Sequence, residues 1–182
     1  MISHKPTGDS QEEERGWGRE SGTKKHWVQR PAIMLFLSTY QNRIDKKGRI
    51  SIPAQFRAVL TAQESPVVIF YPSPINQCLE GCGMQRIMKF NHRVEQFEPY
   101  SPERDAFSAM LFGDSVQLSM DSEGRVLLPP QLVEFAGLKE TVSIVGKGET
   151  FELWEPKAFD DYIDRVRKIV REKRAALKGD AL

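Results

Sequence analysis

The chain has 182 residues, 40% of them apolar and 28% charged, a composition typical of a folded globular protein. Its formal net charge of +1 excludes capture of nucleic acid or lipid by overall charge, so a polyanion would have to be bound by a local basic patch. Its apolar runs are strand-sized and it has two cysteines, which excludes a membrane-spanning helix and a disulfide-stapled secreted fold and favours a reducing cytoplasm.

Residues 1–33 differ in composition from the rest of the chain. They are polar and glycine-rich, and they contain no apolar segment of the kind found in secretory signals. Such a segment buries too little apolar surface to offset its conformational entropy, so we predict a disordered extension, with Met34 as an alternative start. Trp17 and Trp27 leave open an extension that is anchored by its aromatic residues.

An internal repeat follows this extension. Residues 42–57 read NRIDKKGRISIPAQFR, and residues 118–134 read LSMDSEGRVLLPPQLVE. At an offset of 76 these segments share five identical residues, and four further positions are apolar in both. The identical pairs are Asp45 and Asp121, Gly48 and Gly124, Arg49 and Arg125, Pro53 and Pro129, and Gln55 and Gln131. Two copies at this separation predict a pseudo-twofold arrangement rather than a solenoid.

Each copy is predicted to contain a strand, a glycine turn, a second strand, a short helix, a β-hairpin and a longer helix. The hairpin strands 67–70 and 79–82 align with 142–145 and 151–154, so the hairpin connection is three residues longer in the first copy. The helices are expected at Pro53–Leu60, Gly83–Phe97, Ser101–Phe112 and Pro156–Leu177. The predicted divisions are an extension (1–33), a first repeat with its helix (34–98), a connecting helix (99–113) and a second repeat with a C-terminal helix (114–182).

The first glycine turn has an unusual distribution of charge. Strand alternation places Arg43, Asp45 and Arg49 on the face opposite the isoleucines, so both guanidinium groups are expected to project into solvent beside the turn. Gly48 supplies a backbone that adopts positive φ at low cost. Asp45 can accept backbone N–H groups within the turn or hold the Arg49 guanidinium.

We interpret this turn as a rigid loop that reads DNA. Lys46 and Lys47 would contact phosphates, and the planar fork of Arg49 matches the O6 and N7 atoms of guanine. The alternative is a hairpin tip whose charges are simply solvated. The repeat favours a function, because a plain turn does not need to retain arginine, as well as aspartate and glycine, in both copies.

The two loops are not equivalent in charge. The segment Asp45–Arg49 sums to +2, whereas Asp121–Arg125 sums to −1. At the outward position that Ser51 occupies in the first copy, the second copy has Leu127. The first loop is therefore predicted to face DNA, and the second to brace the fold or to contact a neighbouring subunit through Leu127.

At this point the sequence resembles a known family. The segments DKKGRISIP, DSEGRVLLPP, FGDSVQLSMD and VGKGETFELWEP are similar to those of the MraZ family of bacterial transcriptional regulators, in the AbrB-like swapped-hairpin class. The resemblance covers about residues 34–170. It implies a mainly β fold with helices (α+β), a pseudo-twofold swapped-hairpin β-barrel made from two AbrB-like repeats with the helices packed outside.

The resemblance also implies a function. A member of this family is expected to be a sequence-specific DNA-binding repressor, acting in the cytoplasm at the nucleoid on its own cell-division and cell-wall operon. It is expected to read short repeated promoter boxes as a ring-shaped homo-oligomer. The family's DNA-contacting motif carries over onto Asp45 and Arg49, with Lys46 and Lys47 between them, and more weakly onto Asp121 and Arg125. Arg43 joins the predicted DNA-binding residues because strand alternation points it into solvent beside the turn.

A magnitude argument independently favours an oligomer. One bidentate arginine–guanine pair discriminates bases by about 1–3 kcal/mol. Specific binding exceeds non-specific binding by about 4–10 kcal/mol. One loop per molecule therefore falls short, whereas several identical loops on one symmetric assembly add up when they face repeated boxes.

Other classes of function have weaker support in the sequence. No nucleophile–base pattern, nucleotide fingerprint or full set of metal ligands is present, so we expect no enzyme, no cofactor and no small-molecule ligand. Cys78, Cys82 and His92 supply only three potential ligands, and buried thiols are the simpler interpretation. A scaffold or antitoxin-like protein binder remains the alternative, although a patterned helix occupies the end where antitoxins usually carry a toxin-binding tail.

Overall fold

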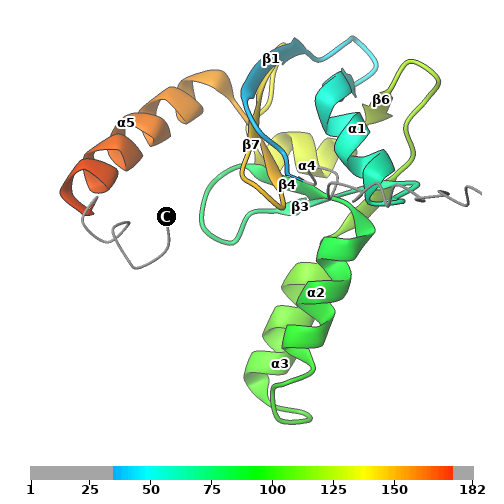
Figure 1. Cartoon of the computed structure of the whole chain (residues 1–182), viewed down its shortest axis with the longest axis vertical. Helices are drawn as coiled ribbons and strands as arrows, with labels where there is room; N and C mark the ends of the chain where they lie inside the picture. The colour runs from blue at the N-terminus through cyan, green and yellow to red at the C-terminus, as the bar shows by residue number, and fades with distance from the viewer. Residues whose placement is uncertain (1–34, 174–182) are drawn as a thin grey trace, which may run out of the picture. The chain divides into compact units, whose positions relative to one another are not determined.

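The structure is a computed structural model, and it describes residues 35–173 (Figure 1). The predicted extension 1–33, the alternative start Met34 and the last residues of the predicted C-terminal helix lie outside this range. The strands are β1 (Thr39–Arg43), β2 (Arg49–Ser51), β3 (Val68–Pro72), β4 (Leu79–Cys82), β5 (Val116–Leu118), β6 (Arg125–Leu127), β7 (Thr141–Gly146) and β8 (Phe151–Trp154). The helices are α1 (Ala54–Ala62), α2 (Met84–Val94), α3 (Pro102–Ser108), the π-helix η1 (Ala109–Gly113), α4 (Pro130–Phe135) and α5 (Pro156–Lys173). None of these helices combines the length and the apolar character needed to cross a membrane.

The strands of the two copies interleave. A six-stranded antiparallel sheet has the order β1-β7-β8-β4-β3-β5, and β2 pairs with β6 in a separate two-stranded ribbon. The pairs β1·β7, β4·β8, β3·β5 and β2·β6 each join one copy to the other. The predicted α+β class is thus confirmed. Within residues 35–173 no pairing joins the edge strands β1 and β5, so the closed swapped-hairpin barrel stays a prediction.

The ribbon lies on the pseudo-twofold axis of the repeat. Ile50 pairs with Val126, which is its own counterpart at an offset of 76. The backbone bonds on either side are matched as well: Ile52 N donates to Gly124 O at 2.9 Å, and Leu128 N donates to Gly48 O at 3.2 Å. Each glycine turn is therefore tied to the strand of the other copy.

The hairpins repeat this symmetry in the large sheet. The predicted alignment of 79–82 with 151–154 is confirmed, because β4 and β8 have these bounds. Glu80 pairs with Glu152, its counterpart in that alignment. The connection between β3 and β4 spans residues 73–78 and the one between β7 and β8 spans 147–150. The first copy therefore carries the longer loop, as expected, but it is longer by two residues rather than three.

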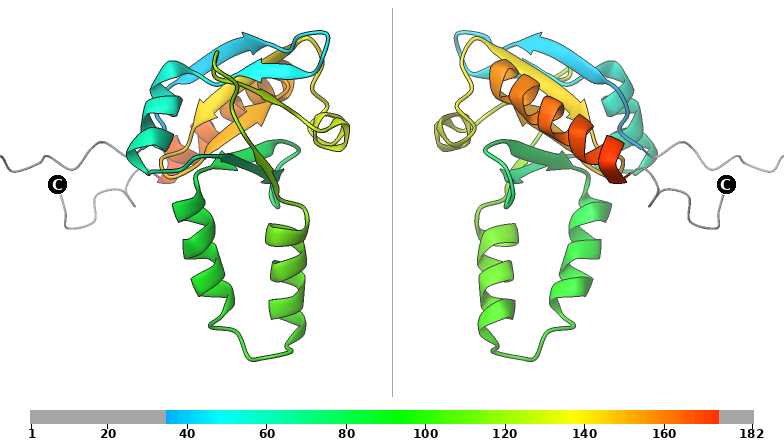
Figure 2. Two further views of the ribbon diagram at one scale, coloured as in Figure 1. Left: turned by 90° about the vertical axis from the view of Figure 1, so that its right-hand side faces the viewer. Right: turned by 90° about the vertical axis from the view of Figure 1, so that its left-hand side faces the viewer.

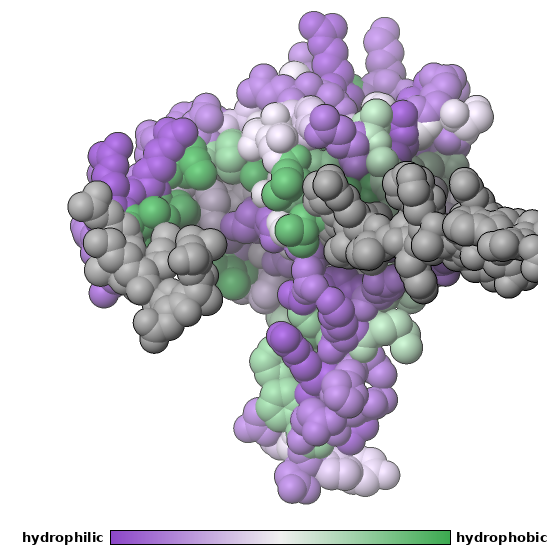
Figure 3. Space-filling view, viewed as in Figure 1, coloured by the Kyte–Doolittle hydropathy of each residue, from purple (hydrophilic) through white to green (hydrophobic). Residues whose placement is uncertain are grey.

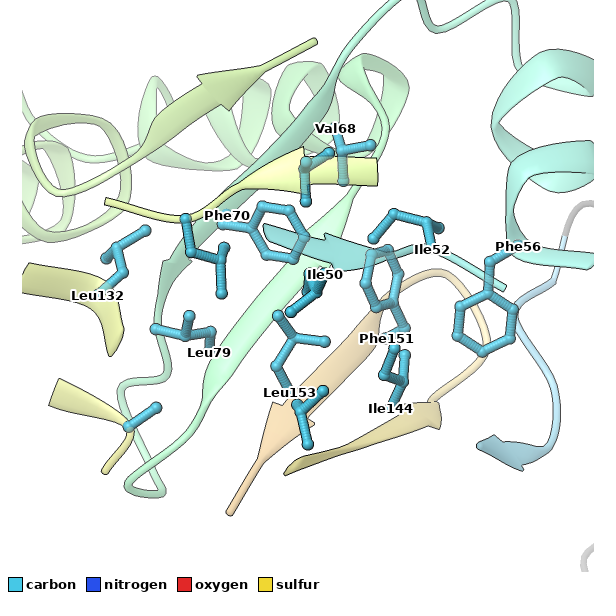
Figure 4. Packing of buried hydrophobic residues seen from close by; sticks show 14 of the residues in the cluster. Ile50, Ile52, Phe56, Val68, Phe70, Leu79, Leu132, Ile144, Phe151 and Leu153 are labelled. Atoms are coloured by element: carbon cyan, nitrogen blue, oxygen red, sulfur yellow. The ribbon is translucent and has the colours of Figure 1, made fainter. Parts of the chain in front are cut away.

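The main core lies between the ribbon and one face of the large sheet (Figure 4). Strand alternation sends every second residue of β3, β4, β7 and β8 to this face. There they meet Ile50, Ile52, Val126 and Leu128 of the ribbon segments and the buried faces of α1 and α4. The Phe151 ring is central, with centroid distances of 5.0 Å to Phe36, 5.2 Å to Phe56 and 5.6 Å to Phe70.

The opposite face of the sheet carries two smaller clusters. Helices α2, α3 and η1 form a hairpin that projects from the sheet and covers Ile69 and Tyr71 (Figures 1 and 2). Helix α5 covers Val145 and Trp154 through Phe159. Cys82 lies on β4 and Cys78 lies in the loop before it, and both are buried free thiols, as expected. His92 is exposed on α2.

Helix boundaries differ from the predictions in local detail. Pro53 was expected in the first turn of α1 but occupies its N-cap, and Pro129 does the same for α4, where Pro130 follows as the first helical residue. Helix α2 ends at Val94 rather than at Phe97. The predicted cap of the connecting helix is confirmed, because the Ser101 hydroxyl accepts a hydrogen bond from Arg104 N at 3.2 Å.

Replacing Phe151, the central residue of the main core, tests this account of the packing. Phe151→Ala should lower the free energy of unfolding by about 3–5 kcal/mol, because a fully buried aromatic ring is replaced by a cavity. Ile169→Ala is the matched control on α5, where the side chain is 56% exposed, and it should change stability by no more than about 0.5 kcal/mol. Urea unfolding at one fixed protomer concentration measures both, and equal losses would contradict the assignment.

Candidate nucleic-acid interface

The first loop is a tight, closed turn between β1 and β2. Asp45 N donates to Arg49 O at 3.0 Å, and Gly48 N donates to Asp45 O at 2.9 Å. Gly48 has a φ of +79°, a conformation that costs other residues strain. The turn is thus fixed by its own backbone, and it holds the side chains around Gly48 in place.

Asp45 performs both of the roles that the sequence left as alternatives. Its Oδ1 accepts from the N–H groups of Lys47 at 2.8 Å and Arg49 at 2.9 Å. Its Oδ2 accepts from Nε of Arg49 at 2.7 Å, and Nη2 lies 2.6 Å away. These bonds, first the backbone N–H and then the guanidinium of Arg49, lower the pKa of Asp45 from 3.8 to about 2. The carboxylate is therefore ionised at neutral pH.

Arg49 is held from one side and open on the other. A guanidinium has five N–H donors in a fixed plane, and Asp45 engages the Nε side of that plane. Within residues 35–173 the Nη1 group has no hydrogen-bond partner, and the side chain is 32% exposed. The free outer edge suits a bidentate acceptor such as a guanine edge or a phosphate.

Other cations surround this arginine. Lys46 and Lys47 at the tip are exposed, and so is Arg43 at the end of β1. Figure 3 shows hydrophilic side chains projecting from the edge of the molecule where β1 and the following loop lie. With Asp45 as the only acid of the segment 43–49, the cluster is strongly basic although the chain as a whole is nearly neutral.

The second loop has the same backbone. Asp121 N donates to Arg125 O and Gly124 N to Asp121 O, both at 2.9 Å, and Gly124 has a φ of +75°. Asp121 Oδ1 accepts from the N–H groups of Glu123 and Arg125, and its Oδ2 accepts from Arg125 Nε at 2.8 Å. The repeated aspartate, glycine and arginine therefore build one structure twice.

The outer edge of the second arginine is occupied. Arg125 Nη2 donates to Glu123 Oε1 at 3.0 Å, and Nη1 lies 2.7 Å from Glu123 Oε2. The hydrogen bond to Asp121 is the main cause that raises the pKa of Arg125, and the charge of Glu123 adds to it. Glu123 stands where the first loop has Lys47, so one substitution changes an open arginine into a satisfied one.

Known proteins similar to this chain match it over most of its length. A family model described as "MraZ protein, putative antitoxin-like" matches residues 35–99 and 111–179. The "Transcriptional regulator MraZ" of Rickettsia canadensis (strain McKiel) is 49% identical over 145 residues, covering 80% of this chain and 97% of that protein. The protein of the same name from Rickettsia bellii (strain OSU 85-389) is 48% identical over 146 residues, with the same coverage of both chains.

The chain belongs to the MraZ family. In this family member the residues predicted from the sequence separate into two groups rather than one site. Because β2 and β6 are antiparallel, Arg49 pairs with Leu127 at one end of the ribbon and Arg125 pairs with Ser51 at the other. The five residues of the segment 43–49 thus gather around the first tip, and Asp121 and Arg125 around the second.

Two supporting residues escaped the sequence analysis. Arg57 Nη1 donates to Ile52 O at 2.9 Å, and its guanidinium lies directly over Gly124. Asn42 Nδ2 donates to Ser51 O at 2.6 Å. The only signal for them was that these polar residues align with the apolar Val133 and Leu118 of the second copy.

Within residues 35–173 no group of three or more His, Cys, Asp or Glu side chains is placed to hold a metal ion.

The ionisation of Asp45 tests the geometry of the first loop. Arg49→Ala should raise the pKa of Asp45 from about 2 toward 3.8 without reaching it, because the backbone N–H at position 49 still donates. Since folding lowers this pKa, the stabilisation is present above 3.8 and is lost as the pH falls toward 2. In the variant the loss begins at the same pH, which the unfolded chain sets, but the stabilisation is smaller and its loss is complete at a higher pH. NMR titration of the carboxyl carbons measures the pKa of Asp45. Asp121 is the internal control, and its pKa should not change.

Proposed function

We propose that this protein is a sequence-specific DNA-binding transcriptional regulator, a repressor that acts in the cytoplasm at the nucleoid on its own cell-division and cell-wall operon. Its relatives are named transcriptional regulators, which describes regulation and no enzymatic reaction. The observation that carries the proposal is the Arg49 guanidinium, fixed by Asp45 on one side and open on the other, on a tip with two exposed lysines. Such a group recognises a planar acceptor with little further loss of side-chain entropy.

The roles within the first loop follow from the geometry of each group. Arg49 reads a base edge in the major groove, where guanine presents O6 and N7 to a planar fork. Lys46, Lys47 and Arg43 neutralise phosphates and position the loop, and they carry no sequence information. Asp45 positions Arg49 and contacts no DNA.

The second loop has a different role in this proposal. Asp121 and Arg125 form a closed ion-pair cluster with Glu123, and its charge is negative. An arginine with both edges engaged offers little to a phosphate, and Glu123 repels it. We therefore assign Asp121 and Arg125 to the stability of the ribbon, and the first loop alone to the reading of DNA.

Reading by one loop per subunit requires several subunits on one DNA. The contribution of a single arginine, about 1–3 kcal/mol, is below the 4–10 kcal/mol that separates specific from non-specific binding. A ring-shaped homo-oligomer that faces repeated promoter boxes supplies the difference. The interleaved pairing of the two copies supports the swapped-hairpin arrangement, which holds the reading loop rigidly on each subunit.

A scaffold or antitoxin-like role has less support. Antitoxins of this class usually carry a toxin-binding tail after the barrel. In this chain α5 follows the second copy and packs on the sheet, with Trp154 stacked on Tyr162 at 4.7 Å.

Two single variants, Arg49→Ala and Arg125→Ala, distinguish the roles of the two loops. Arg49→Ala should abolish the preference for duplex DNA from upstream of the protein's own gene over a shuffled duplex, because each reading loop loses about 1–3 kcal/mol of base discrimination. Arg125→Ala, assayed at a temperature at which circular dichroism shows it to be folded, should leave that preference unchanged. Fluorescence anisotropy titrations with both duplexes measure it. Equal losses on both duplexes for Arg49→Ala would remove its base-reading role.

The lysines should behave as phosphate-binding groups. Lys46→Ala or Lys47→Ala should weaken binding to both duplexes alike and reduce the log–log dependence of affinity on salt by about 0.9 for each phosphate that is no longer neutralised. Lys139→Ala, an exposed lysine outside both loops, is the control and should leave this slope unchanged. A lysine variant that bound only the promoter duplex more weakly would contradict this division of roles.

A further inference from the structure

A small pocket lies where the helical hairpin meets the large sheet. Helix α2 and the α3–η1 segment project side by side from the sheet, and the pocket is lined by both of them and by the end of the β3–β4 hairpin (Figure 2). Its volume is about 290 Å³. Pockets that bind small molecules have volumes of about 300–1,000 Å³, so this one suits a ligand at the lower end of that range.

The walls of the pocket are mainly aromatic. Tyr71 and Phe90 form an edge-to-face pair at the sheet, with ring centroids 6.3 Å apart. Phe97 and Phe107 stack at 5.4 Å farther along the hairpin. These two residues are 37% and 41% exposed, so the fold leaves part of each ring uncovered. The uncovered surface is available to an apolar group that enters the pocket.

One wall belongs to an unusual element. Met110 and Leu111 line the pocket from η1, the π-helix that follows α3. Single π-helical turns are rare in proteins, and they occur frequently at functional sites. The wall therefore agrees with a use of the pocket beyond the packing of the hairpin on the sheet.

The sheet contributes one carboxylate to the pocket. Glu80 Oε2 accepts from Tyr71 OH at 2.9 Å, and Glu80 Oε1 accepts from the Ser73 hydroxyl at 2.8 Å. Burial raises the pKa of Tyr71 and the charge of Glu80 raises it further, so this phenol stays protonated and acts as a donor. A carboxylate has about four acceptor positions, and the two hydroxyls leave the others for a ligand.

Glu80 has no cationic partner in the part of the chain that the structure describes. It pairs with Glu152 across β4 and β8, and like charges at such a position destabilise a sheet. Glu152 is compensated, because Trp154 Nε1 donates to it at 2.8 Å and Lys147 Nζ lies 3.5 Å away. Within residues 35–173 no lysine or arginine forms an ion pair with Glu80. A cation that entered the pocket would supply the missing compensation.

The pocket also contains one unpaired cation. Arg93 of α2 is exposed and lines the pocket, and its side chain has no hydrogen-bond or ion-pair partner among residues 35–173. Arg86 of the same helix is engaged within the fold, because its guanidinium lies 4.3 Å from the centroid of Phe90 and binds Glu149. Arg93 and Glu80 therefore present opposite charges to one cavity without pairing with each other.

This distribution of charge selects a dipolar ligand. An ammonium group alone is repelled by Arg93, and a carboxylate alone is repelled by Glu80. We propose that the pocket binds a free amino acid with an apolar side chain. Its ammonium group donates to Glu80, its carboxylate accepts from Arg93, and its side chain packs against the aromatic walls. Each polar contact is a charge-assisted hydrogen bond.

The sequence gave no sign of this ligand, and we expected none from it. The residues that line the pocket come from the β3–β4 hairpin, α2, α3 and η1, and they form no local motif. No residue of either glycine turn lines the pocket, so the proposed site is separate from the residues that we assign to DNA.

Calorimetric titration of the full chain with L-phenylalanine tests the class of ligand. We expect a Kd of about 1 mM or lower. The analogue 2-phenylethylamine lacks the carboxylate and 3-phenylpropionate lacks the ammonium group, so each should bind at least about tenfold more weakly. Glycine, which lacks the apolar side chain, should not bind. An analogue with a single charge that bound as tightly as L-phenylalanine would overturn the assignment of a dipolar ligand.

Two substitutions test the roles of the charged residues. Glu80→Gln and Arg93→Gln should each weaken the binding of L-phenylalanine at least about tenfold. Glu80→Gln should not weaken 3-phenylpropionate, and Arg93→Gln should not weaken 2-phenylethylamine, whereas a collapsed pocket would lose both analogues. Glu140→Gln and Arg171→Gln, at exposed positions outside the pocket, are the matched controls and should bind like the wild type. Circular dichroism verifies that each variant folds.

Methyl NMR of the methionines locates the ligand. L-phenylalanine should shift the methyl resonance of Met110, which lines the pocket, and should leave that of Met120, which packs against the main core, unchanged. Absence of binding at about 10 mM, or a shift of Met120 without one of Met110, would overturn the proposal. Either result would leave DNA reading by the first loop intact, because the titrations with Arg49→Ala measure a different site.

Discussion

The β2–β6 ribbon is the contact on which the rest of the structure depends. It pairs Ile50 with Val126, and both side chains are buried in the core that they share with the large sheet. An isolated two-stranded hairpin is only marginally stable, so each glycine turn closes through its own backbone bonds but depends on the strand of the other copy for its place in the fold. The backbone bonds from Ile52 and Leu128 to the opposite glycines make this dependence reciprocal.

Duplication of one loop has produced two different electrostatic outcomes on nearly the same backbone. In both copies an aspartate accepts two backbone N–H groups and holds the Nε side of an arginine. The outcome depends on the residue two positions after the aspartate, which is Lys47 in one loop and Glu123 in the other. A carboxylate there occupies the remaining donors of Arg125, while an ammonium group leaves those of Arg49 open. Net charge alone, +2 against −1, indicated the direction of this difference but not its geometry.

The features that were predictable from the sequence are those that local patterns determine. The repeat, the bounds of β4 and β8, the Ser101 cap and the turn at Gly48 depend on residues close in sequence. The order of the large sheet and the position of Arg57 over Gly124 depend on contacts between segments far apart in the chain, so they required the structure. Pro53 was misplaced by one residue because a proline suits both the N-cap and the first turn, and sequence spacing does not distinguish them.

The rigidity of the first loop links the fold to the proposed reading of DNA. The backbone bonds of the turn and the pairing of β2 with β6 hold Gly48, and Asp45 holds the Nε side of Arg49. A loop that is already ordered loses little entropy when it binds. In the proposed assembly several such loops face one DNA, and their effective concentration adds to the affinity of each loop. Rigidity and multivalency therefore act in the same direction, because ordered loops hold a constant spacing against repeated boxes.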